Sequence, residues 1–234
     1  VWWADDQRVP VEQASLVQRE PLPVASPGRT DQEQRNRAAF AALKSDGSVV
    51  AWGDPDSGGD ISGVAERLSG DVTQIFSSAG AFTALKGDGS VVSWGDSGRG
   101  GVIPPSLLAD LDEAVVRLAS NDFAFAAVTH SGAVVSWGDA SNGGYSRAMD
   151  DQLASGVVEV FASQSAFAAL KQDGSVVTWG RDSAGGDSSA VSTELSSGVV
   201  EIVSTDSAFA ALKDDGSVVS WGNPAAGGNS TLVA

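Results

Sequence analysis

Five tryptophans recur along this chain at intervals of 42 or 43 residues, and a glycine follows each of them. They are Trp52, Trp94, Trp137, Trp179 and Trp221. Five phenylalanines keep the same intervals, namely Phe40, Phe82, Phe125, Phe167 and Phe209. A fixed period of this length is typical of propellers and solenoids, in which each repeat is one small supersecondary unit that packs on its neighbours.

The fourth copy shows the content of one repeat. Residues 156–161 form a short β-branched run after a glycine, and residues 166–171 form a second apolar run; both predict strands. Asp173-Gly174 predicts a tight hairpin, because glycine adopts positive φ without steric cost, and residues 175–179 form the third strand. Residues 188–198 follow a Gly-Gly loop and predict one or two helical turns.

The side-chain alternation of a strand places Phe167 and Ala169 on one face of the second strand and Ala166 and Ala168 on the other. Alanine at these positions indicates close approach of an adjacent sheet. We therefore expect the repeat tryptophans to pack in the core between neighbouring sheets.

These patterns predict an all-β fold: a β-propeller-like array of five sheets with three to four strands each, and a short helical turn in every repeat. An open arc or a β-solenoid is the alternative. We divide the chain into an extended N-terminal arm, residues 1–38, and a five-repeat propeller, residues 39–234. The repeats span about 39–80, 81–123, 124–165, 166–207 and a partial copy at 208–234.

The string AFAALKSDGSVVAWGD at residues 39–54 and its four relatives resemble the repeat of the regulator-of-chromosome-condensation family. The shared features are Phe40 to Leu43, the Asp46-Gly47 hairpin, Val49 to Gly53 and the Gly58-Gly59 loop. The resemblance implies a β-propeller of four-stranded sheets. The repeats are shorter than is usual in that family and number five where the founding members have seven, which resembles a short variant of about 42 residues found in bacteria and microalgae.

The formal net charge of the chain is −16. Because nucleic-acid affinity depends on Lys and Arg neutralising phosphates, we expect no nucleic-acid partner. There is no cysteine, which excludes disulfides and thiolate metal sites, and no apolar stretch is long enough to span a membrane. The chain begins at Val1, which suggests a processed N-terminus and an organelle lumen or the extracellular space.

Catalytic side chains are scarce. His130 is the only histidine and Tyr145 the only tyrosine, and we interpret His130 as an exposed turn residue. General acid–base and nucleophilic chemistry most often uses an imidazole, so we predict that the chain is not an enzyme and needs no cofactor.

Three aspartates, Asp54, Asp56 and Asp60, crowd the first Gly-Gly loop at spacings similar to those of a calcium loop. The equivalent loops do not keep these ligands. Asx turns are therefore the simpler interpretation, and a metal site is a weak candidate.

The lysines all occupy one repeat position, at Lys44, Lys86, Lys171 and Lys213. They are candidates for a basic ring that binds an acidic partner. The alternative is that each lysine extends into solvent beside the hairpin aspartate two residues further on, as a weak surface pair.

The arm carries the adjacent aromatics Trp2 and Trp3, followed by a stretch rich in Gln, Arg and Pro. Such a segment is ordered only where something holds it. It either wraps its own propeller or docks on another subunit with Trp2 and Trp3 as anchors.

We conclude from the sequence that a non-enzymatic protein–protein interaction scaffold, or an accessory subunit of a larger assembly, is the leading hypothesis; a peripheral subunit of an algal photosynthetic complex is one example. The partners would be protein subunits. An extracellular adhesion module that binds glycans or calcium is a second hypothesis, and a small-GTPase exchange-type regulator is a third.

Overall fold

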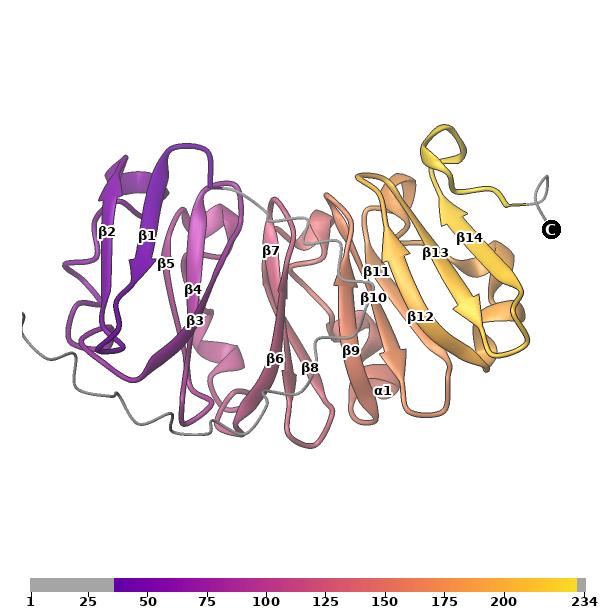
Figure 1. The fold of residues 1–234 in the computed structure, drawn as a ribbon, viewed down its shortest axis with the longest axis horizontal. Helices are drawn as coiled ribbons and strands as arrows, with labels where there is room; N and C mark the ends of the chain where they lie inside the picture. The colour runs from indigo at the N-terminus through magenta and orange to yellow at the C-terminus, as the bar shows by residue number, and fades with distance from the viewer. Residues whose placement is uncertain (1–35, 231–234) are drawn as a thin grey trace, which may run out of the picture.

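The computed structural model describes residues 36–230, which form a row of antiparallel β-sheets standing side by side (Figure 1). The first sheet, which contains β1 and β2, lies at one end of the row, and the last, which contains β14, lies at the other. The predicted all-β, propeller-like array is confirmed. Over residues 36–230 the array is open.

The first sheet has two strands in the part of the chain that the structure describes, β1 (Ala39–Leu43) and β2 (Val49–Gly53). The second sheet contains β3 (Val72–Ser77), β4 (Ala81–Lys86) and β5 (Val91–Gly95). The third contains β6 (Val115–Ser120), β7 (Ala124–Thr129) and β8 (Val134–Gly138). The fourth contains β9 (Val157–Ala162), β10 (Ala166–Lys171) and β11 (Val176–Gly180). The fifth contains β12 (Val199–Ser204), β13 (Ala208–Lys213) and β14 (Val218–Gly222).

Each tight hairpin joins the last two strands of a sheet, as the Asp-Gly pairs predict. In the fourth sheet Gly174 has φ +76°, and the Asp173 carboxylate accepts hydrogen bonds from the Ser175 backbone N–H (2.9 Å) and hydroxyl (2.6 Å). The resulting register places Phe167 opposite Trp179, and the two rings stack with centroids 5.3 Å apart.

The segments that follow the second, third and fourth sheets contain the predicted helical turns, mostly as 3₁₀ turns, whereas residues 62–68, after the first sheet, form hydrogen-bonded turns only. The helical turns are η3 (Pro105–Leu107), η5 (Arg147–Met149), α1 (Asp150–Leu153), η7 (Ser189–Val191) and η8 (Glu194–Ser196). A second set of 3₁₀ turns, which the sequence did not predict, opens each Gly-Gly loop. They are η1 (Pro55–Ser57), η2 (Ser97–Arg99), η4 (Ala140–Asn142), η6 (Asp182–Ala184) and η9 (Pro224–Ala226).

The core consists of apolar layers between neighbouring sheets. Between the fourth and fifth sheets, Ala166, Ala168 and Leu170 pack against Phe209 and Trp221. Val191 and Leu195 of the connecting turns join the same layer. Alanine is therefore buried in the layer where two sheets pack on each other, and side chains of the helical turns join that layer.

One expectation needs correction. Within residues 36–230 four sheets contain three strands and the first contains two, where the family resemblance implied four in each. In each three-stranded sheet the first strand comes from the end of one sequence repeat and the other two from the next, in the order of strand, strand, tight hairpin and strand that the fourth copy predicts. β3, for example, precedes residue 81 and pairs with β4.

Candidate interaction surfaces

The sheets are joined by a junction that repeats along the row. Each repeat tryptophan after Trp52 has a buried indole N–H, which donates a hydrogen bond to a glycine carbonyl in the Gly-Gly loop of the preceding sheet. The pairs are Trp94 to Gly58 (3.0 Å), Trp137 to Gly100 (3.1 Å), Trp179 to Gly143 (3.0 Å) and Trp221 to Gly185 (3.0 Å). The same loop glycines have φ between +92° and +97° and lie against the phenylalanine ring of the next sheet. The aromatic pair and the loop therefore form one interlocking contact.

The first sheet has no sheet before it within residues 36–230, and its aromatic pair is open to solvent. Phe40 and Trp52 still stack, with centroids 5.4 Å apart, but they are 65% and 52% exposed. The expectation that all five repeat tryptophans pack in the core is therefore wrong for Trp52, because nothing described supplies the loop that would cover it. The other four are 0–4% exposed.

A column of backbone hydrogen bonds also runs from sheet to sheet, from Arg37 just before β1 through the bends between the first and second strands of the four three-stranded sheets. The N–H groups of Arg37, Ala79, Asp122 and Gln164 donate to the carbonyls of Ala79, Asp122, Gln164 and Asp206, respectively, at 3.0–3.2 Å. The mostly buried Asp122 carboxylate adds hydrogen bonds from Arg37 (2.6 Å) and from Gln164 (3.1 Å). These bonds fix the spacing between sheets.

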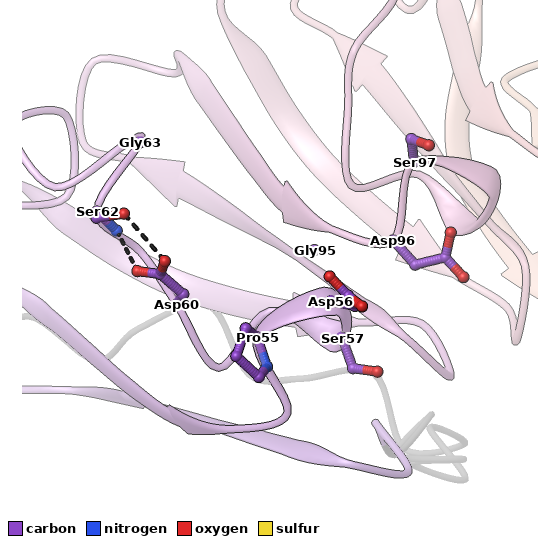
Figure 2. A pocket seen from close by; sticks show the side chains of 9 residues that line it. All are labelled: Pro55, Asp56, Ser57, Asp60, Ser62, Gly63, Gly95, Asp96 and Ser97. Carbon is purple, nitrogen blue, oxygen red and sulfur yellow. Dashed lines mark hydrogen bonds between the residues drawn. The ribbon is translucent and has the colours of Figure 1, made fainter.

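The Gly-Gly loops of the first and second sheets enclose an open cleft of about 580 Å³, which we call the loop cleft (Figure 2). Three carboxylates line it: Asp56 and Asp60 from the first loop and Asp96 from the second. Hydrogen bonds from the Ser62 backbone N–H (2.8 Å) and hydroxyl (3.0 Å) lower the pKa of Asp60 below its ordinary value, so it is ionised at neutral pH. The loop cleft is thus an anionic surface.

The calcium hypothesis gains no support from these loops. The Asp54 carboxylate accepts the Ser57 hydroxyl hydrogen bond (2.6 Å), and Asp60 forms the Asx turn with Ser62. Residues 36–230 contain no group of three His, Cys, Asp or Glu side chains that could hold a metal ion. A site at Asp54, Asp56 and Asp60 remains an untested hypothesis.

The four lysines occupy equivalent hairpin positions but differ in what they contact. Lys171 and Lys213 donate to the backbone carbonyls of Gln152 (2.7 Å) and Glu194 (2.6 Å) in the preceding turns. Lys44 lies 3.7 Å from the hairpin carboxylate of Asp46. Lysine in this position therefore stabilises the connecting turn in two sheets, and binding of an acidic partner by Lys44, Lys86, Lys171 and Lys213 stays a prediction.

Trp2 and Trp3, with most of the N-terminal arm, lie outside the described residues. His130 is exposed in the third hairpin, as predicted, and Tyr145 is 54% exposed. No helix among residues 36–230 has the length and apolar character needed to cross a membrane.

Comparison with known proteins places the fold. No family model matches the sequence, and no curated protein matches it either. Among solved structures, the chain is similar to human WBSCR16, with 19% identity over 80% of this chain and 60% of that one and a TM-score of 0.51. It is also similar to Prp20p from Saccharomyces cerevisiae, whose structure was reported with its binding to Gsp1p and histones; here identity is 17% over 80% and 56%, and the TM-score is 0.50.

A third match is yeast RCC1 (Prp20) bound to Kap60, with 17% identity over 80% of this chain and 54% of that one and a TM-score of 0.51. The described part of the chain therefore has the RCC1-type repeat fold of these β-propeller proteins. The chain spans 54–60% of the length of these three proteins.

The sequence did not predict two features of these surfaces, the exposed aromatic pair of the first sheet and the column of backbone hydrogen bonds. The exposed state of Phe40 and Trp52 follows from their place in the first copy, and a count of neighbours per repeat would have found it. The column through Ala79 and Asp122 carries no sequence signal, because it uses backbone groups at positions with unrelated side chains.

Proposed function

We propose that the chain is a non-enzymatic protein-interaction module that acts as a scaffold or accessory subunit. The observation that carries this proposal is the interlocked row of sheets, which holds the loops and hairpins of successive sheets at fixed spacing along each edge. Binding surfaces in folds of this kind are made by loops on a rigid framework. The open, polar loop cleft fits contact with an extended protein segment better than enclosure of a small molecule.

Charge favours a basic partner. The net charge is −16, and Asp56, Asp60 and Asp96 gather in the loop cleft. A surface of this sign attracts and orients cationic partners and repels nucleic acid. Histone binding reported for Prp20p concerns a basic partner of this kind and supports the chemistry of the proposal.

The test is saturable binding to a purified partner. Crosslinking in an extract of the source organism would identify candidates, and titration calorimetry with each purified candidate would then give affinity and stoichiometry. A triple variant, Asp56→Asn, Asp60→Asn and Asp96→Asn, should weaken binding at least about tenfold and flatten its salt dependence. The four-lysine variant to serine is the matched control and should bind normally; the reverse pattern would favour the basic ring. If no purified protein binds saturably, the proposal is wrong.

A small-GTPase exchange regulator is the second candidate, favoured by the fold similarity to Prp20p and its reported binding to Gsp1p. Acceleration of nucleotide release from a purified small GTPase would support it. The short bacterial or microalgal repeat variant, the peripheral photosynthetic subunit and the glycan- or calcium-binding adhesion module remain finer proposals that share this fold.

A further inference from the structure

The fourth sheet has an edge strand with free backbone groups. Its strand order is β9-β10-β11, so β11 pairs with β10 on one side only within residues 36–230. In an antiparallel strand the N–H and C=O groups of successive residues point to alternate sides. The hairpin hydrogen bond from the Lys171 N–H to the Ser175 carbonyl (2.9 Å) fixes this alternation. Val176 and Thr178 therefore direct their backbone groups away from β10, where no hydrogen bond from residues 36–230 meets them.

The free edge of β11 lines a second cleft, which we call the strand cleft. It is an open cavity of about 640 Å³, and Val176, Val177 and Thr178 of β11 contribute to its lining. The other lining residues come from the turn before the fourth sheet, within 149–152, from the hairpin, and from the segment after the sheet, within 186–196. The unpaired strand edge is thus flanked by two segments of the same chain.

In the second sheet an arginine occupies the corresponding edge. Arg67, from the segment before that sheet, donates through Nη2 to the carbonyl of Val91 in β5 (2.9 Å). Val91 is the counterpart of Val176 in the register of the two hairpins. The carbonyl that Arg67 occupies in β5 is therefore free in β11.

In the third sheet an arginine joins the two flanking segments. Arg147 donates through Nη2 to the Ser106 carbonyl (3.1 Å) and lies 3.5 Å from the Asp110 carboxylate. Ser189 occupies the same repeat position, 42 residues further on. Its side chain is too short for such a bridge, and within residues 36–230 no hydrogen bond joins the two segments beside the strand cleft. The fourth sheet is thus left accessible at this place.

The strand cleft is anionic. Three carboxylates line it: Asp151, Asp173 and Asp187. Hydrogen bonds from the hydroxyl and N–H of the serine two residues further on lower the pKa of Asp173 and of Asp187, so both are ionised at neutral pH. Lys171 also lines the cleft, but its ammonium group already donates to a backbone carbonyl of the preceding turn (2.7 Å). The cleft therefore combines free backbone groups with uncompensated negative charge.

We propose that an extended segment of a partner protein, carrying lysine or arginine side chains, docks in the strand cleft as an additional β-strand beside β11. Its backbone pairs with the N–H and C=O groups of Val176 and Thr178, as in strand addition to an exposed sheet edge. Its basic side chains lie against the three carboxylates of the cleft. The inference rests on the proposed function, because it specifies a second place and a form in which the chain binds protein.

A synthetic hexapeptide of alternating lysine and valine, added to the full chain, tests the proposal. Titration calorimetry should show saturable 1:1 binding. Amide hydrogen exchange at Val176 and Thr178 should slow at least about tenfold when the peptide saturates the chain. Val91 and Ser93, at the corresponding positions of β5, are the internal reference and should exchange at an unchanged rate. A peptide that does not bind overturns the proposal.

N-methylation of the peptide separates strand pairing from attraction between charges. Two variants carry N-methyl groups on all lysines or on all valines, and both keep the charge of the parent peptide. Because alternate N–H groups of a strand point to one edge, one variant should bind at least about tenfold more weakly and the other should bind like the parent. Equal affinities of the two variants overturn the proposal.

A substitution in the chain closes the cleft in the manner of the third sheet. Ser189→Arg places an arginine where Arg147 bridges the flanking segments, and it should weaken peptide binding at least about tenfold. Ser141→Arg is the matched control, since it adds the same charge at an exposed serine that lines neither cleft. This control should bind the peptide like the wild-type chain. Equal affinities of Ser189→Arg and Ser141→Arg contradict the inference.

The outcomes also separate this inference from the proposed function. A chain that has no protein partner, but binds the peptide with the methylation pattern expected, contradicts the proposed function alone. A partner that binds through the loop cleft, while exchange at Val176 and Thr178 stays unchanged, contradicts this inference alone.

Discussion

Replacement of a loop glycine by alanine tests how tightly the Gly-Gly loop of one sheet packs on the aromatic pair of the next. Gly143 has φ +96°, and a Cβ there would lie 2.6 Å from Cδ2 and 2.9 Å from Cε2 of Phe167. Phe167 is fully buried, so its ring has no room to retreat. Gly143→Ala therefore carries two costs, the left-handed backbone conformation and the overlap with the ring.

The two costs can be separated by the same change at Gly227. Gly227 has a matching φ of +98°, and the added methyl group meets nothing within 4 Å. The backbone cost common to both is about 1–2 kcal/mol. Overpacking adds about 1–3 kcal/mol at Gly143 alone. We expect Gly143→Ala to lower the free energy of unfolding by about 2–5 kcal/mol, and Gly227→Ala by about 1–2 kcal/mol.

Urea unfolding followed by tryptophan emission provides the assay. Gly185→Ala should behave like Gly143→Ala, because its Cβ would lie 2.5 Å from the Phe209 ring. Equal losses at Gly143 and Gly227 would refute the reasoning, since the strain of the backbone alone would then account for both.

Three further predictions concern single side chains. Trp137→Phe should cost about 1–3 kcal/mol of unfolding free energy, because it leaves a buried carbonyl without its indole donor, whereas Trp52→Phe should be nearly neutral in the same urea assay. Asp122→Ala removes the acceptor of two side-chain hydrogen bonds between sheets and should cost about 1 kcal/mol by calorimetry; an unchanged melting temperature would contradict this. Ser175→Ala should raise the pKa of Asp173, which hydrogen bonds from the Ser175 hydroxyl and N–H hold below its ordinary value. Because that pKa is lowered on folding, the hydrogen bonds to Asp173 stabilise the folded chain at pH values above the ordinary aspartate pKa, about 4. This stabilisation is lost as the pH falls through the lower pKa of the folded state. Carboxyl NMR titration checks both points.

The sequence predicted what depends on local pattern. Strand alternation assigned Ala166 and Phe167 to opposite faces, and the structure places them in layers on opposite sides of the fourth sheet. The Asp-Gly hairpins and the helical turns followed from the same kind of local signal. What escaped prediction depends on neighbours in space: the indole bond to a glycine carbonyl, the backbone column, and the exposure of Trp52. In a periodic sequence every copy has nearly the same local sequence. The sequence alone therefore does not distinguish the copies at the ends of the row from those inside it.

The same limit applies to the candidate surfaces. The shared repeat position of the lysines suggested one shared role, but Lys171 donates to a backbone carbonyl while Lys44 lies near its hairpin carboxylate. The turn that accepts the Lys171 hydrogen bond varies in sequence from copy to copy, so equivalence along the chain did not ensure equivalence of contact.

Fluorine NMR of the chain labelled with 5-fluorotryptophan tests the central claim most directly. Each resonance is assigned by a Trp→Phe variant, and its shift between H₂O and D₂O reports solvent contact. Four of the five repeat tryptophans should show no solvent shift and Trp52 a large one. Five equal solvent shifts would contradict the account, because the aromatic pairs would then not lie between interlocked sheets.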